Sequence, residues 1–246
     1  MRHLRRIIGL TLVLALAVCS FASCNKKQEK LTSAADEYLG ANAYSVDVRV
    51  KYTSEDEAMA TAISKISGTT AKISVDGDKL SAIMYLKNGD TQNYAQFTFI
   101  DGTLYTEFSE GGKVSESTKT YTDEDKAALR EALGAGATIS YDDFEEVEVD
   151  TVKKVSVISC ENIKSEAIDA LTAPLKAQLE TVFESAEVSV YTVTLDIEIE
   201  DGRYNVIILN CEYFITTPTN SYTINMEYSM KFDYVSAVEI TAPSFA

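Results

Sequence analysis

Acidic side chains and a pair of cysteines are the residues of this chain that could ligate a metal, transfer a proton or act as a nucleophile. The densest acidic run, Asp142–Asp150, holds six carboxylates. Calcium takes six to eight oxygen ligands, usually from a D-x-D-x-D-G loop, and the sequence has no such loop. Val147 and Val149 alternate with the acids, which is typical of a strand with one solvated face. We therefore predict no metal site in this run.

Histidine chemistry is excluded from most of the chain, because the only histidine is His3. Ser-His-Asp and Cys-His catalysis and every histidine metal site need that side chain. A second acidic cluster, Asp123–Asp125, is explained by a helix N-terminus, where negative charge complements the helix dipole. The chain has no Gly-rich phosphate loop and no nucleophile elbow. A glycosidase-type carboxylate pair stays open, but nothing in the sequence indicates one. The sequence thus predicts a non-enzymatic protein with no catalytic residues and no cofactor.

Cys160 and Cys211 both lie in segments with the pattern of buried strands. In an exported protein, two such cysteines can form a disulfide. The alternative is a pair of buried thiols that act as small apolar side chains. The distance between the two strands decides between these interpretations.

The first 23 residues have the pattern of a secretory signal peptide. Arg2, Arg5 and Arg6 precede an apolar run, Ile7–Val18, and small residues follow it. A membrane-spanning helix needs roughly 20 apolar residues, and this run has 12. We therefore predict a signal peptide over residues 1–23 and place the protein on the extracytoplasmic side of a membrane.

Ala22-Ser23-Cys24 resembles the lipobox of bacterial lipoproteins. The resemblance implies that Cys24 becomes the N-terminus and carries a diacylglycerol thioether, with residues 24–30 as a short tether. Two acyl chains hold a protein stably on a bilayer. The alternative, an ordinary cleaved signal, would release a soluble protein.

The chain is acidic, with 38 Asp and Glu against 22 Lys and Arg and a formal net charge of −16. Nucleic-acid binding depends on Lys and Arg contacts to phosphate, so nucleic acid is excluded as a partner. The same charge keeps the body of the protein off an anionic membrane surface, so the anchoring would fall to Cys24. A protein partner cannot be identified from the sequence.

Helical periodicity appears in four places. Ser54–Glu57 has the spacing of a capping box, and Pro174 is expected to kink or split the longest helix. The four expected helices cover Leu31–Asn42, Glu55–Ser67, Thr122–Leu133 and Ser165–Ser185.

Most of the other segments alternate apolar and polar residues, which is typical of strands with one buried face. Turn signals at Asp76-Gly77, Asn88-Gly89, Asp101-Gly102 and Asp201-Gly202 separate several of them. The expected strands cover Tyr44–Tyr52, Ala71–Val75, Leu80–Leu86, Tyr94–Ile100, Thr103–Phe108, Val152–Cys160, Tyr191–Ile199, Tyr204–Ile215, Tyr222–Tyr234 and Ser236–Thr241. A sheet of this kind buries its apolar face under helices, so we predict an α+β fold, a large curved antiparallel half-barrel wrapped over a few helices.

This layout resembles the LolA/LppX-like lipoprotein superfamily. The resemblance lies in the acylated cysteine, the short first helix, the meander with Asp-Gly turns, the helical insertion and the long final hairpins, over Leu31–Pro243. It implies a single domain, residues 31–246, that folds as an unclosed β-barrel with helices in its mouth. It also implies that lipids or lipoproteins bind in the apolar space between sheet and helices. No residue role is carried over, because the match has no signature motif.

The last long strand offers the best ligand-facing candidates. Its apolar residues all point to one side, and Met and Tyr adapt to varied apolar shapes. These candidates are Tyr222, Met226, Tyr228, Met230 and Phe232. The alternative is that they are simply core under the Ser165–Ser185 helix. The sequence therefore predicts a membrane-anchored lipoprotein that binds an apolar ligand such as lipid; the alternative function is a cell-surface interaction or sensor domain without a small ligand.

Overall fold

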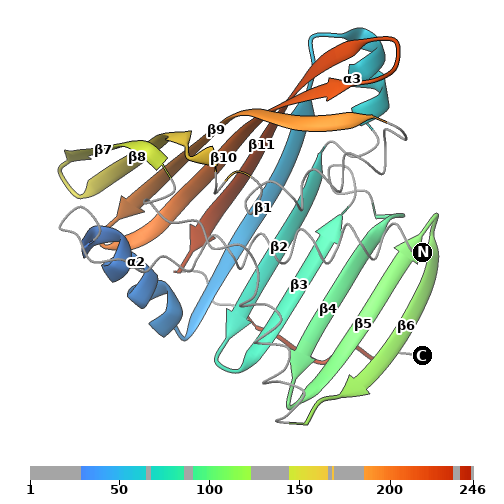
Figure 1. The fold of residues 1–246 in the computed structure, drawn as a ribbon. Coiled ribbons are helices and arrows are strands. Elements are labelled where there is room, and N and C mark those ends of the chain that lie inside the picture. Colours follow the sequence, from blue (N-terminus) through green and yellow to red (C-terminus); the bar gives the residue numbers. More distant parts are fainter. Residues whose placement is uncertain are drawn as a thin grey trace.

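The structure, a computed structural model, describes residues 29–64, 68–85, 91–122, 144–165, 168, 186–234 and 239–244. Within these residues, eleven strands form one antiparallel sheet in the order β6-β5-β4-β3-β2-β1-β11-β10-β9-β8-β7 (Figure 1). The strands are β1 Ala43–Thr53, β2 Thr69–Asp76, β3 Lys79–Tyr85, β4 Tyr94–Ile100, β5 Thr103–Glu110, β6 Lys113–Thr120, β7 Phe144–Val152, β8 Val155–Ile163, β9 Glu187–Glu200, β10 Arg203–Thr216 and β11 Ser221–Asp233.

The sheet is two meanders joined at their middle. From the middle of the sheet, β1 to β6 follow one another toward one edge, and β11 to β7 follow one another toward the other edge. At the middle, β1 pairs with β11, from Ser45 opposite Asp233 to Thr53 opposite Asn225. β6 and β7 are the two ends of the order, so the sheet is unclosed. This confirms the predicted α+β half-barrel.

Two of the predicted Asp-Gly turns are confirmed as tight hairpins. Asp101 and Gly102 join β4 to β5 with φ of 50° and 74°, and Asp201 and Gly202 join β9 to β10 with φ of 49° and 80°. Positive φ at both central residues is the mark of a type I′ turn, whose twist matches that of the strands. The turn predicted at Asp76-Gly77 lies one residue later, at Gly77-Asp78, because β2 continues through Asp76. Asn88-Gly89 lies outside the described residues.

The predicted strands agree with the sheet except at three places. β6 was not predicted, because all eight of its residues are exposed and none of the apolar alternation that marks a strand is present. The second place is Val152, which was predicted to begin a strand but is the last residue of β7. A turn at Lys153-Lys154 follows it, and β8 begins at Val155. The predicted strand Ser236–Thr241 is wrong where it can be compared, since Glu239–Ser244 has no regular secondary structure.

Two of the predicted helices lie in the described residues. α2 covers Glu29–Gly40 and α3 covers Glu57–Ile63. The N-cap of α3 is Asp56, whose side chain accepts a hydrogen bond from the Met59 amide at 2.8 Å, so the capping box predicted at Ser54 is wrong. The Ser54 hydroxyl instead donates to the Thr223 carbonyl of β11 at 2.8 Å. The predicted Thr122–Leu133 helix and nearly all of Ser165–Ser185, Pro174 included, lie outside the described residues.

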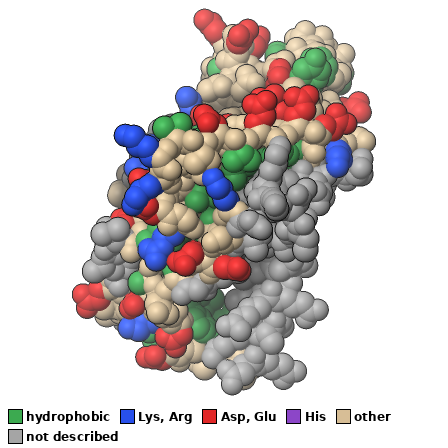
Figure 2. Space-filling view, turned by 90° about the vertical axis from the view of Figure 1, so that its left-hand side faces the viewer, with side chains coloured by type: hydrophobic (Ala, Val, Ile, Leu, Met, Phe, Trp, Pro, Cys, Tyr) green, Lys and Arg blue, Asp and Glu red, His purple; other side chains and the backbone are tan. Residues whose placement is uncertain are grey.

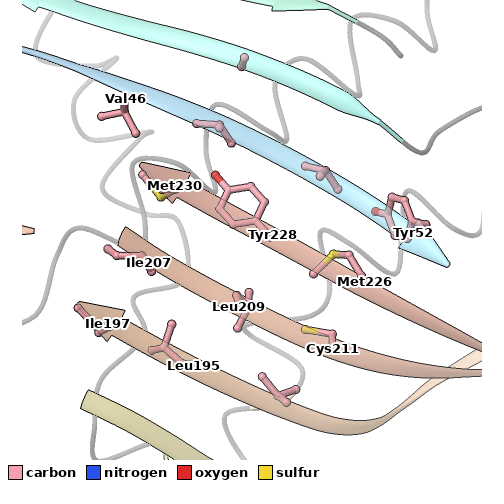
Figure 3. Packing of buried hydrophobic residues seen from close by; sticks show 14 of the residues in the cluster. Val46, Tyr52, Leu195, Ile197, Ile207, Leu209, Cys211, Met226, Tyr228 and Met230 are labelled. Carbon is pink, nitrogen blue, oxygen red and sulfur yellow. The ribbon is translucent and has the colours of Figure 1, made fainter. Parts of the chain in front are cut away.

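One face of the sheet, here called the inner face, holds the core. Residues directly opposite on antiparallel strands share a face, so the pairing traces apolar rows across the sheet. One row runs through ten strands: Val149, Ile158, Ile197, Ile207, Met230, Val48, Ala71, Met84, Ala95 and Phe108. Figure 3 shows part of this core, with Leu195, Leu209 and Tyr228 side by side on neighbouring strands.

α2 packs on the inner face at the ends of β9 and β10 (Figure 1). Ala34 and Tyr38 of α2 are buried, and the Tyr38 ring lies 5.6 Å from that of Phe232, edge to face. Arg203 at the start of β10 forms an ion pair with Glu37 at 3.4 Å. Helix α2 is thus held over one end of the sheet by its buried apolar side chains and this ion pair.

Candidate ligand-binding surface

The candidate residues from the last strand are brought together on the inner face, but most of them are buried. Met226, Tyr228 and Met230 are each 1% exposed, and Phe232 is 5% exposed. Tyr222, at the end of β11, is half-buried, and its hydroxyl lies 3.0 Å from the Asn220 side-chain amide. The four buried residues belong to the core cluster, and a ligand role for the stripe stays a prediction.

A different part of the inner face is only partly buried. Five apolar side chains on β3, β4 and β5 are only partly buried, and we call them the apolar patch: Leu80, Phe97, Phe99, Leu104 and Phe108. The tight turn at Asp101-Gly102 places Phe99 opposite Leu104, and Leu80 pairs with Phe99 from the other side. Of the two described helices, neither lies over these strands (Figure 1).

The polar edge strand β6 borders the apolar patch. Ser115 lies opposite Phe108, and Lys119 lies opposite Leu104, so both are on the inner face. The Lys119 ammonium lies 4.4 Å from the centre of the Tyr121 ring, and that ring lies 6.3 Å from the ring of Phe99. An apolar floor with a cationic border suits an amphiphile whose chain lies on the rings.

Sequence reasoning missed the apolar patch. The alternation of Ala95, Phe97 and Phe99 is visible in the sequence and assigns these residues to one face. Alternation does not say whether that face is covered, because the cover comes from distant segments of the chain. The residue types could therefore mark the patch as apolar but not as accessible.

The two cysteines are free thiols, so the disulfide that the sequence left open is not formed. Cys160 on β8 lies opposite Leu195, and Cys211 on β10 lies opposite Val193, so strand β9 separates them. Two strand spacings are about 9 to 10 Å, more than the roughly 7 Å between Cα atoms that a disulfide can bridge. Both are instead small buried side chains of the core.

Burial makes these thiols poor nucleophiles. Desolvation raises the pKa of Cys160 and of Cys211 to about 12, because the thiolate would lose its hydration. Tyr52 and Tyr213, near Cys211 on the same face, have their pKa raised chiefly for the same reason. This end of the core is therefore uncharged at neutral pH and offers no reactive group.

The raised thiol pKa values predict that the protein loses stability in alkali. Unfolded thiols release their protons above pH 9, whereas the folded thiols hold theirs to about pH 12. The stabilisation is present below pH 9 and is lost as the pH rises, by up to ~1.4 kcal/mol per thiol for each pH unit above 9. Urea unfolding at pH 8 and pH 10 measures the loss, and the Cys160→Ala, Cys211→Ala double variant should show a smaller one. An equal loss in both proteins would assign the pH dependence to other groups.

The acidic run forms the exposed side of β7, with Glu145, Glu146, Glu148 and Asp150 exposed. The described residues contain no group of three or more acidic or cysteine side chains placed to hold a metal ion. In the same residues, no helix is both long enough and apolar enough to span a membrane. Residues 1–23, Cys24 and residues 25–28 lie outside them.

Comparison with known proteins gives a structural similarity only. No protein-family model and no curated protein matches the chain. The structure is similar to that of lipoprotein LppX of Mycobacterium tuberculosis, with a TM-score of 0.39 and 9% identity over 87% of this chain and 97% of that chain. Two much weaker similarities, each with a TM-score of 0.12, are to the dehydratase domain from the CurK module of curacin polyketide synthase (7% identity, 83% and 80% covered) and to the tesB protein of Mycobacterium avium subs paratuberculosis (10% identity, 83% and 85% covered).

The fold assignment itself rests on the strand order and pairing, which show one unclosed antiparallel sheet with its core on a single face.

Proposed function

We propose that this protein is a membrane-anchored, non-enzymatic lipoprotein that binds an apolar ligand such as a lipid on the inner face of its sheet. The proposal rests on the apolar patch. This patch continues the apolar rows of the core onto β3, β4 and β5, where the side chains on the inner face are only partly buried. Apolar surface left in water is unfavourable, so a ligand that covers this patch would gain its burial free energy.

The geometry of the patch favours an elongated ligand over a compact one. Phe97 and Phe108 lie edge to face with their ring centres 5.6 Å apart, and Phe99 and Leu104 extend the patch toward the turn. An acyl chain can lie along such a row without a deep cavity. The proposed anchor at Cys24 would hold the sheet close to a bilayer, which is the source of such chains.

A charged residue in the patch should remove the bound ligand. In the protein purified from membranes into an amphipathic polymer, we expect Phe99→Glu to retain at least tenfold less extractable lipid than the wild type, because an acyl chain would then bury a carboxylate. Lipids are extracted with organic solvent and quantified by mass spectrometry. Val114→Glu is the matched control, since Val114 is 53% exposed on the opposite face of neighbouring β6. Equal lipid content in the two variants, both folded by circular dichroism, would contradict the proposal.

The second candidate function, a surface interaction domain, has one observation in its favour. Tyr191 and Phe214 are 74% and 44% exposed at the same end of β9 and β10, where a bulge interrupts the pairing. Large exposed rings are typical of protein contacts. Tyr191→Ser with Phe214→Ser would abolish capture of a specific envelope protein under this alternative and would leave the lipid content unchanged.

A further inference from the structure

A groove on the outer face of the sheet, opposite the core, is separate from the apolar patch. It has a volume of about 470 Å³ and is lined, among the described residues, by parts of β1, β2 and β3: Asp47, Val48, Arg49, Thr70, Ala71, Lys72 and Tyr85. Val48 and Ala71 point to the inner face, so the side chains that face the groove are polar or charged. Its volume lies within the roughly 300 to 1,000 Å³ of small-molecule sites.

The register places the two cations of the groove close together. Arg49 lies opposite Thr70, and Lys72 lies opposite Asp47, so Arg49 and Lys72 are diagonal neighbours on one face. Diagonal neighbours on antiparallel strands are within reach of each other's long side chains, and like charges at this spacing repel. The pair therefore favours a counter-ion between its two charged groups.

Among the described residues, no carboxylate forms an ion pair with either cation. The ion pairs among the described residues join Lys79 to Asp76, Lys154 to Asp201 and Arg203 to Glu37, and none involves Arg49 or Lys72. Asp47 faces Lys72 across the pairing yet is not within 4.0 Å of it. Two unpaired cations lining one groove stand out in a chain with a net charge of −16. Figure 2 shows Lys and Arg side chains on its left side, interspersed with Asp and Glu side chains.

The geometry points to a binding site in this groove for a phosphate ester of a small polyol, either free or as a lipid headgroup. Arg and Lys bind phosphate through charge-assisted hydrogen bonds, and the Thr70 and Tyr85 hydroxyls add neutral donors beside them. Asp47 would repel a second phosphate but can accept hydrogen bonds from ligand hydroxyls. The combination matches one phosphate together with a hydroxylated body. The site lies on the opposite face from the apolar patch, so it does not depend on the function proposed above.

Calorimetric titration of the full chain in detergent tests the site with glycerol 3-phosphate as the probe. We expect saturable binding, weaker binding of inorganic phosphate and none of glycerol. Arg49→Gln and Lys72→Gln should each weaken the binding of glycerol 3-phosphate at least tenfold. Lys51→Gln, on the same face of β1 but outside the groove, should change its affinity less than twofold. Asp47→Asn should tighten the binding of inorganic phosphate. It should therefore reduce the ratio between the affinity for glycerol 3-phosphate and the affinity for inorganic phosphate.

The source of the phosphate is distinguished with short-chain lipids. If dihexanoyl-phosphatidylglycerol also binds, Arg49→Gln weakens its binding, and dihexanoyl-phosphatidylcholine does not bind, then the ligand is a lipid headgroup. If only the binding of glycerol 3-phosphate depends on Arg49, then the ligand is the free ester. Absence of saturable glycerol 3-phosphate binding, or an equal loss in Lys51→Gln, would overturn the inference. Neither result bears on lipid retained at the apolar patch, which Phe99→Glu tests separately.

Discussion

Replacing Leu209 with alanine should lower the free energy of unfolding by about 3 to 5 kcal/mol. Leu209 is fully buried at the centre of β10, opposite Leu195 on β9 and Tyr228 on β11 (Figure 3). Strands β9 and β11 are hydrogen-bonded to β10 on both sides, so Leu195 and Tyr228 cannot move into the space that the missing side chain leaves. Urea unfolding followed by circular dichroism measures the change.

Phe214→Ala is the matched control on the same strand. It removes a larger apolar side chain, but Phe214 points to the outer face and is 44% exposed, so we expect a cost below about 1 kcal/mol. Leu209→Met, which conserves volume, should cost less than about 1.5 kcal/mol. A larger loss for Phe214→Ala than for Leu209→Ala would mean that the two faces of the sheet have been assigned the wrong way round.

Replacing Cys24 with serine should move the protein from the membrane fraction to the soluble fraction of the cell envelope. Serine cannot form the thioether that carries diacylglycerol, and without acyl chains an acidic protein has little affinity for an anionic bilayer. Fractionation with immunoblotting measures the change, and metabolic labelling with a fatty-acid analogue should mark the wild type and not the variant.

Cys19→Ser is the control for this prediction, because Cys19 would leave with the signal peptide. It should neither release the protein nor abolish labelling. If the wild type is itself soluble and unlabelled, the N-terminus is an ordinary cleaved signal, and the proposed anchor fails while the fold and the apolar patch are unaffected.

The central strands could be predicted from the sequence because their environment is regular. β9, β10 and β11 lie in the middle of the sheet and burial alternates along much of each strand; in β9 and β11 the sequence alternates apolar and polar residues in step with it. β6 gave no such signal, since all eight of its residues are exposed and, among the described strands, it pairs with β5 only. Turn chemistry was informative where both central residues need positive φ, as at Asp201-Gly202.

Strand order accounts for what the sequence could not decide about the sites. Whether Cys160 and Cys211 meet depends on β9 lying between their strands, which no local pattern encodes. The apolar side chains of β11 and those of β4 look alike in sequence, yet Met226 is buried and Phe99 is only partly buried. The outer groove depends on Arg49 and Lys72 lying diagonally opposite each other, and only the β1–β2 register determines that arrangement.

The two terminal strands of the sheet have a consequence for how copies of this protein behave when crowded. β6 presents Lys113, Glu116 and Lys119, and β7 presents four exposed carboxylates between Glu145 and Asp150. Free strand edges invite another chain to add on, and charged side chains there oppose it. Two copies that meet through their β7 edges should therefore repel each other, so the acidic border opposes this way of joining two sheets.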